Sequence, residues 1–122
     1  MVRTETIIAV ENVPESSRFY QKLLGCKSTH GGEYFEILKD DDVVVLCLHK
    51  WGEHEHPTMV DPDTTAGNGL ILFFRVEDLE QIFDNAQKLN GHIIREIHYN
   101  ENSLKNQFSM RDPDGYYIII SE

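Results

Sequence analysis

The sequence has few cysteines and no long apolar run, and each shortage excludes a class of protein. Its two cysteines, Cys26 and Cys47, form no CxxC motif and are too few for a disulfide framework. We therefore expect both to be reduced, packed thiols of a cytoplasmic protein. The longest uncharged apolar runs, 43–48 and 69–74, have the length of strands and are too short to cross a membrane. Because the first ten residues lack the apolar stretch of a secretion signal, we expect neither a membrane anchor nor export.

Basic clusters are also missing. The chain has 11 lysines and arginines against 21 aspartates and glutamates, a formal net charge of −10 at pH 7. Binding of nucleic acid requires a basic face for the phosphates, so we expect no nucleic-acid partner. The acidity permits a cationic partner but is equally typical of a protein kept soluble by its surface charge.

Several motifs of known chemistry are absent as well. The chain has no GxSxG, phosphate-binding or dinucleotide-binding motif. The acidic run 40–42 lacks the glycine and the distal glutamate of a calcium loop and is expected to be a solvated turn. Cys47 and His49 lie two residues apart on an expected strand, but nothing else marks the thiol as activated.

One segment is dense in side chains that bind metals. His49 begins the sequence HKWGEHEH there, and His54 and His56 alternate with two glutamates at its end. Gly52 and Pro57 bracket most of the segment in an expected loop, which lacks the fixed one-face spacing of a helical zinc motif. We expect a polar loop rather than a dedicated metal site, and adventitious binding of a metal there stays open.

What the sequence does contain is an internal repeat. Segment 7–25 reads IIAVENVPESSRFYQKLLG and segment 73–91 reads FFRVEDLEQIFDNAQKLNG. An offset of 66 aligns the two without a gap and superposes QKL on QKL and Gly25 on Gly91. Each copy has the pattern of a strand, a capped amphipathic helix and a glycine stop. One supersecondary unit is therefore used twice.

The remaining segments extend each repeat with three short strands. The alternation of apolar residues and the turn signals predict helices near 12–24 and 78–90 and strands at 4–10, 26–30, 33–38, 43–49, 70–76, 92–99, 107–111 and 116–121. The polar segment between them, with two prolines, is expected to be a linker. A ferredoxin-like βαββαβ fold would need only two strands between the helices, and the spacing is too long for it.

Two stretches resemble a known superfamily. VENVPESSRFYQKLLG is similar to the first-helix signature of the vicinal oxygen chelate (VOC) proteins, the glyoxalase/bleomycin resistance/extradiol dioxygenase superfamily, and RDPDGYYIIISE is similar to its C-terminal signature. The resemblance implies an α+β fold of two βαβββ modules related by a pseudo-twofold axis, with curved mixed sheets that form a cleft. It implies a single domain over 1–122, with module one at 1–50, a linker at 51–68 and module two at 69–122. A homodimer is implied too.

Metal-dependent members of that superfamily hold a divalent ion with four side chains. The motif spacings place these positions at Glu5, Leu46, Ile71 and Ile119, of which only Glu5 can donate. Shifting the register by one residue restores no set of four ligands, and a metal site needs at least three protein donors. We therefore expect no metal and no other cofactor.

The cleft that the resemblance implies is then an apolar cavity with few polar groups, which is typical of small-molecule pockets. Alternation along the strands gives a set of candidate ligand-binding residues: Glu5, Ile7, Leu46, Leu48, Ile71, Phe73, Arg75, Phe108, Tyr117 and Ile119. We expect Arg75 or Tyr117 to be the partner of Glu5. The sequence favours a metal-independent protein that binds a small molecule. The alternative is a glyoxalase-type lyase or a dioxygenase that uses Glu5 with an unrecognised metal site or as a general base.

Overall fold

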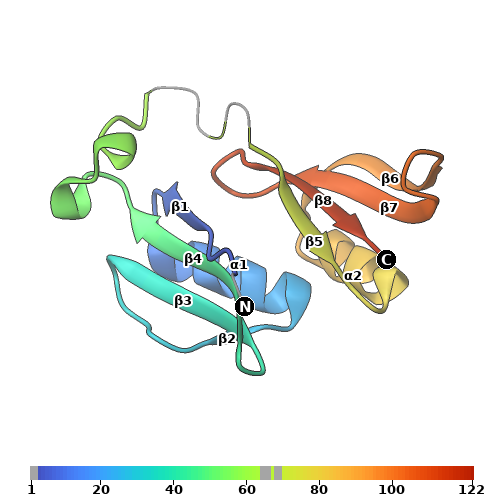
Figure 1. Ribbon diagram of the computed structural model, residues 1–122, viewed down its shortest axis with the longest axis horizontal. Helices are drawn as coiled ribbons and strands as arrows, with labels where there is room; N and C mark the ends of the chain where they lie inside the picture. The colour runs from blue at the N-terminus through green and yellow to red at the C-terminus, as the bar shows by residue number, and fades with distance from the viewer. Residues whose placement is uncertain (1–2, 64–66, 68–69) are drawn as a thin grey trace. The chain divides into compact units, whose positions relative to one another are not determined.

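The computed structural model describes the chain except residues 1–2, 64–66 and 68–69, and it contains two compact units. Unit 1 spans residues 1–64 and unit 2 spans residues 65–122 (Figure 1). The elements of unit 1 are β1 (Ile7–Val10), α1 (Val13–Leu24), β2 (Lys27–Ser28), β3 (Phe35–Asp40) and β4 (Val43–Lys50). Those of unit 2 are β5 (Leu72–Arg75), α2 (Leu79–Lys88), β6 (His92–Asn100), β7 (Lys105–Arg111) and β8 (Tyr117–Ser121).

Both units contain the same four-stranded mixed sheet. The strand order is β1-β4-β3-β2 in unit 1 and β5-β8-β7-β6 in unit 2. Strand β1 runs parallel to its neighbour β4, and β5 runs parallel to its neighbour β8. All other neighbouring strands are antiparallel. The predicted βαβββ repeat is therefore confirmed.

Helix α1 begins and ends where the sequence predicts. Asn12 has an extended backbone, and its side-chain oxygen accepts a hydrogen bond of 3.0 Å from the backbone N–H of Glu15. Pro14 lies in the first turn, where a missing N–H costs nothing. Gly25 ends the helix in the left-handed conformation at φ 78°, which glycine adopts without strain.

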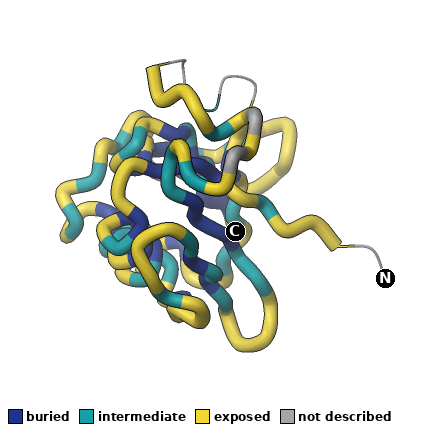
Figure 2. The backbone as a smooth tube through the Cα atoms, turned by 90° about the vertical axis from the view of Figure 1, so that its left-hand side faces the viewer, coloured by how far each residue is buried: buried dark blue, intermediate teal, exposed yellow. Residues whose placement is uncertain are grey.

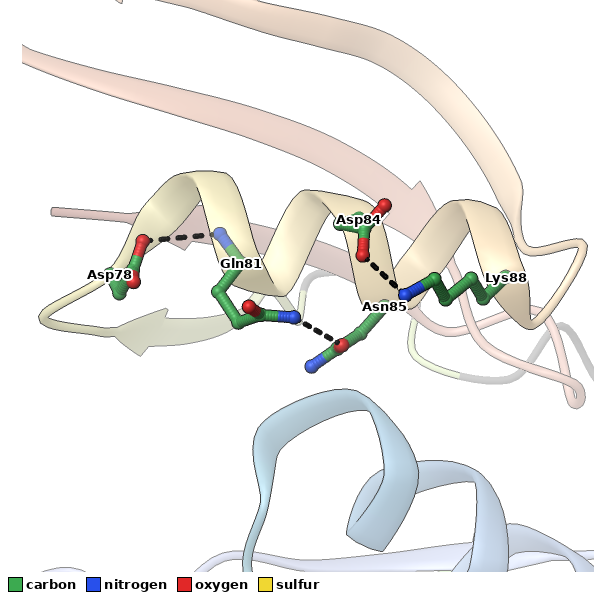
Figure 3. Close-up of polar contacts among 5 residues, drawn as sticks. All are labelled: Asp78, Gln81, Asp84, Asn85 and Lys88. Atoms are coloured by element: carbon green, nitrogen blue, oxygen red, sulfur yellow. Dashed lines mark hydrogen bonds and ion pairs between the residues drawn. The ribbon is translucent and has the colours of Figure 1, made fainter.

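Helix α2 repeats the N-terminal cap but ends differently. Figure 3 shows the Asp78 carboxylate accepting from the N–H of Gln81 at 3.1 Å, and an ion pair of 2.8 Å between Lys88 and Asp84. At the C-terminus the left-handed residue is Asn90, at φ 53°, and not the glycine after it. Gly91 lies in a crowded place, because a Cβ there would be 3.0 Å from the backbone oxygen of Ala86 and 2.7 Å from Cε of Met110.

Each helix packs on one face of its own sheet, the helix-covered face, and leaves an open face. In unit 1 the hydroxyl of Ser17 on α1 donates to the Glu36 carboxylate, which identifies the face that contains Glu36 as the covered one. In unit 2 the ring of Phe83 on α2 packs edge-on against Phe108, with the ring centroids 5.1 Å apart. The buried stretches of the chain are dark blue in Figure 2, and the core of the two covered faces consists of Ile8, Val10, Leu38, Leu46, Leu48, Leu72, Phe108, Met110, Ile118 and Ile120.

Three predicted site residues belong to these cores. Leu48 pairs with Ile8 and with Glu36, Leu46 is two residues away, and both leucines are at most 1% exposed. Phe108 is fully buried against α2. Leu46, Leu48 and Phe108 therefore lie on the helix-covered faces of their own sheets, and alternation assigned them to the wrong face.

Two carboxylates are buried among the described residues: Glu36 in the core of unit 1, and Asp112 in a turn of unit 2. One oxygen of Glu36 accepts from the backbone N–H groups of His30, Gly31 and Ile37 at 3.2, 2.9 and 2.9 Å. The other accepts from the hydroxyls of Ser17 and Ser28 at 3.0 and 2.7 Å. Burial raises the pKa of Glu36, but these hydrogen bonds outweigh it, and the pKa lies below the usual value.

The segment expected to be a linker, 51–68, contains two short 3-10 helices in its described part. They span Glu53–Glu55 and Pro57–Met59. The expected start of module two at residue 69 lies outside the described residues. No helix in the described part of the chain is long and apolar enough to cross a membrane.

Candidate functional site: the open faces of the two sheets

Half of the predicted site residues lie on the open face of the unit 2 sheet. Leu72 and Ile118 pair on the covered face, so Phe73, Arg75, Tyr117 and Ile119 lie on the open one. Ile71, two residues before Phe73, extends this set. Five of the ten predicted residues therefore lie on one surface. Strand β7 was predicted to contribute Phe108 to this surface, but it contributes other side chains.

Strand pairing arranges the open face of unit 2 in three rows across the sheet. The central row crosses all four strands as Arg95, Ser109, Ile119 and Phe73. The rows on either side contain His92, Arg111 and Tyr117, and His98, Gln107, Ser121 and Arg75.

The middle of this face is apolar and in part accessible. Phe73 is 46% exposed and Ile71 is 53% exposed, whereas Tyr117 and Ile119 are half-buried. The polar groups around them are held in place. The amide of Asn100 donates to Gln107 at 3.1 Å, and the Arg75 guanidinium donates to the main-chain oxygen of Glu122 at 2.6 Å. An apolar centre with a few fixed polar groups is the usual composition of a small-molecule site.

The open face of unit 1 is formed by different residues from those predicted. Ile7 and Ala9 lie on it as expected, with Cys47 and His49 of β4 as their neighbours. Burial raises the pKa of the Cys47 thiol, and the negative charges of Glu5 and Glu36 raise it further. The thiol is therefore a poor nucleophile, as its sequence context predicts.

Glu5 itself is half exposed. Its carboxylate lies 4.0 Å from the Arg3 guanidinium, and the two side chains are 50% and 57% exposed. Within unit 1 the partner of Glu5 is thus Arg3, and the expected pairing with Arg75 or Tyr117 of unit 2 stays a prediction. An exposed pair at this distance contributes little to stability.

Imidazole rings gather at the end of β4. His49 is only 3% exposed, and its ring centroid lies 5.1 Å from that of His54 and 4.9 Å from that of His56. Nδ1 of His49 lies 2.8 Å from the carbonyl of Lys50, which can only accept, so Nδ1 carries the proton. Nε2 then accepts from Nδ1 of His54 at 3.1 Å. The segment is thus not wholly a loop, because its first histidine belongs to a strand and is buried.

The residues do not fit a metal of the type that the resemblance implies. Of the implied ligand positions, Glu5 precedes β1, Leu46 lies on the covered face with Cys47 next to it on the open one, and Ile71 and Ile119 have alkyl groups with no lone pair to donate. Among the described residues no group of three or more His, Cys, Asp or Glu side chains is arranged to hold a metal ion.

A small hollow of about 160 Å³ lies at the N-terminus of α1. It is lined by Glu11, Asn12, Val13, Pro14, Glu33 and Lys50. The backbone N–H group of Glu15 already donates to the side chain of Asn12. It is therefore not available to bind an anion in the hollow.

The candidate residues chosen from the sequence do not include most of the polar residues of the unit 2 open face. Segment 107–111 reads Gln-Phe-Ser-Met-Arg, and this alternation indicates that Phe108 and Met110 share the covered face while Gln107, Ser109 and Arg111 share the open one. Arg95 had no such signal, because two irregularities in the pairing of β6 with β7 shift its register.

Two βαβββ units with four-stranded mixed sheets define the glyoxalase fold. Residues 3–120 match the model of the Glyoxalase/Bleomycin resistance protein/Dioxygenase superfamily, and the chain belongs to this family. No curated protein matches the chain.

Solved structures with the same fold are distant in sequence. One is a glyoxalase/bleomycin resistance protein/dioxygenase family enzyme from Burkholderia phytofirmans PsJN, with 16% identity, 96% of this chain and 94% of that chain covered, and a TM-score of 0.79. A lactoylglutathione lyase from Agrobacterium tumefaciens has 16% identity, coverage of 99% and 92%, and a TM-score of 0.73. TioX from Micromonospora sp. ML1 has 12% identity, coverage of 100% and 98%, and a TM-score of 0.74. At these identities the likeness shows the fold alone.

Proposed function

We propose that the chain binds a small, partly apolar molecule without a metal, and that the open face of the unit 2 sheet holds this molecule. The observation that supports this most is the exposure of Phe73 beside Ile119 and Tyr117 on the face opposite α2. Contiguous large apolar side chains on an uncovered sheet face are typical of binding surfaces. Burial of about 100 Å² of apolar ligand and protein surface would contribute roughly 2.5 kcal/mol.

The metal-independent part of the proposal rests on the donor set. A single carboxylate next to apolar side chains cannot replace the water shell of a divalent ion, because removal of that shell costs several kcal/mol. Glu5 is the one carboxylate at an implied ligand position, and it is half exposed and paired with Arg3.

The alternative is a lyase or dioxygenase in which Glu5 acts as a ligand or a general base. A glutamate base gains strength from removal of water around its carboxylate. The 50% exposure of Glu5 and its proximity to a guanidinium provide the opposite environment. The structure therefore supports the binding protein better than the enzyme.

A titration of tag-free protein with the neutral probe 2-naphthol tests the proposal. We expect saturable binding by the wild type and a loss of about fivefold or more in affinity for Phe73→Ser, since that variant removes the aromatic contact. Tyr99→Ser is the matched control: Tyr99 is an aromatic residue that is 56% exposed on β6, paired with Asn106 outside the open-face rows. Equal affinity of the two variants, or no saturable binding by the wild type, would contradict the proposal.

A further inference from the structure

The open face of unit 2 has a charge opposite to that of the whole chain. Three of the chain's five arginines, Arg75, Arg95 and Arg111, lie on it, one in each row. No residue that strand pairing places in the three rows is an aspartate or a glutamate. This arrangement occurs in a chain with 21 acidic residues and a formal net charge of −10.

None of the three guanidinium groups forms an ion pair with a carboxylate side chain within the described residues. Arg75 and Arg111 each donate to a main-chain oxygen, that of Glu122 at 2.6 Å and that of Gly115 at 2.8 Å. Each also lies 5.4 Å from the centroid of an aromatic ring, Phe73 for Arg75 and Tyr117 for Arg111. A guanidinium has five N–H donors, so both retain donors for a ligand.

Along the central row, apolar residues lie at one end and a charged residue lies at the other. Phe73 and Ile119 form the apolar end, the buried Ser109 follows, and the exposed Arg95 lies on the next strand. Neighbouring strands are about 4.8 Å apart, so Arg95 lies roughly 10 Å from Ile119 across the sheet. A fused ring system on Phe73 and Ile119 would extend over the strand of the buried Ser109, and a substituent at its far end would come within reach of Arg95.

We infer that the molecule bound on the open face of unit 2 is a small organic anion. Its apolar body lies on Phe73 and Ile119, and its carboxylate or phosphate group lies at Arg95. Arginine binds both oxyanions through paired N–H donors. The inference rests on the proposed function and names the class of its ligand.

Four probes with the same ring system separate the inference of an anionic ligand from the proposed function. They are neutral 2-naphthol, cationic 2-naphthylmethylamine, and the anions 2-naphthoate and 2-naphthyl phosphate. In low salt we expect the wild type to bind at least one anion about fivefold or more tightly than 2-naphthol, and the amine most weakly. The stronger of the two anions identifies the head group. This preference should fall at 0.5 M NaCl, because salt screens exposed charges.

The variants locate the anion. Arg95→Gln should remove most of the preference for the anion and leave the affinity for 2-naphthol within about twofold, whereas Arg95→Lys should retain part of the preference. Arg18→Gln, which changes an exposed arginine of α1, is the matched control and should bind as the wild type does. Binding of 2-naphthol without preference for either anion would overturn the inference and leave the proposed function standing. Failure of all four probes would overturn both, and an anion preference that survives Arg95→Gln would refute the role of Arg95.

Discussion

Replacement of Glu36 by glutamine is the most informative test of how unit 1 is held together. The carboxylate is 3% exposed and accepts five hydrogen bonds, three of them from backbone N–H groups between β2 and β3 and at the start of β3. It thus fixes the loop 29–34 onto the sheet and ties α1 to β3 through Ser17. Without it, buried donors of both segments would have no acceptor.

The size of the effect depends on which hydrogen bonds survive. In Glu36→Gln the remaining carbonyl oxygen still accepts from the three N–H groups, and the two serine hydroxyls can rotate to accept from the new amide. The loss is then that of charge assistance, about 1–2 kcal/mol in the free energy of unfolding. Glu36→Ala leaves the buried N–H groups without a partner and should cost about 3–5 kcal/mol.

The effect of Glu36→Gln should depend on pH with a defined sign. The pKa of Glu36 in the folded chain lies below its unfolded value, so its charge contributes stability above the unfolded pKa, which is about 4.3. This contribution is lost as the pH falls through the folded pKa. The difference between wild type and Glu36→Gln should therefore be constant from pH 8 to about pH 5 and shrink in more acidic solution.

Urea unfolding followed by tryptophan fluorescence measures this difference in unit 1, because Trp51 is the single tryptophan of the chain and belongs to that unit. Glu33→Gln, an exposed glutamate three residues away, is the control and should change the free energy of unfolding by less than about 0.5 kcal/mol. A Glu36→Gln protein as stable as the wild type at pH 7, or a difference that grows in acid, would refute the reasoning.

Two further predictions concern the packing. Gly91→Ala should lower the free energy of unfolding of unit 2 by about 1–3 kcal/mol, because the added methyl group crowds the backbone oxygen of Ala86 and displaces the end of Met110. No change on urea unfolding followed by circular dichroism would contradict the close approach. Burial raises the pKa of Cys26 to about 11 and also raises that of Cys47, so at pH 8 both thiols should react with Ellman's reagent far more slowly in the folded protein than in urea. Equal rates in the two states would show that the thiols are not buried.

The fold could be predicted from the sequence because the signals for its helices and strands are local and occur in both repeats. The cap residues Asn12 and Asp78 place both helices, and the offset of 66 residues predicts the second unit from the first. Gly91 shows the limit of this reasoning, since the two glycines align but serve different needs, one of backbone conformation and one of space. The pseudo-twofold relation and the homodimer stay predictions.

Alternation assigned side chains to the correct sheet face on β5 and β8 and to the wrong face on β4 and β7, and the binding of a ligand by these residues stays a prediction. Strand β4 reads Val-Val-Val-Leu-Cys-Leu-His and is apolar on both faces, so alternation cannot say which of Leu46 and Cys47 faces α1. Only pairing with β1 and β3 decides this, and such pairing depends on residues distant in the sequence. Arg95 of β6 was missed because irregular pairing with β7 shifts its register, whereas the alternation of β7 is regular and indicates the face of Arg111.

Mapping of a neutral probe onto the isotope-labelled protein tests the central claim most directly. When ¹⁵N-labelled wild type is titrated with 2-naphthol, the largest saturable shifts of backbone amide signals should occur at Phe73, Ile119 and Ser109, the central row of the unit 2 open face. Signals of Tyr99, which lies outside the open-face rows, should move little. Largest shifts in unit 1 or at Tyr99 would contradict the claim, as would the absence of any saturable shift.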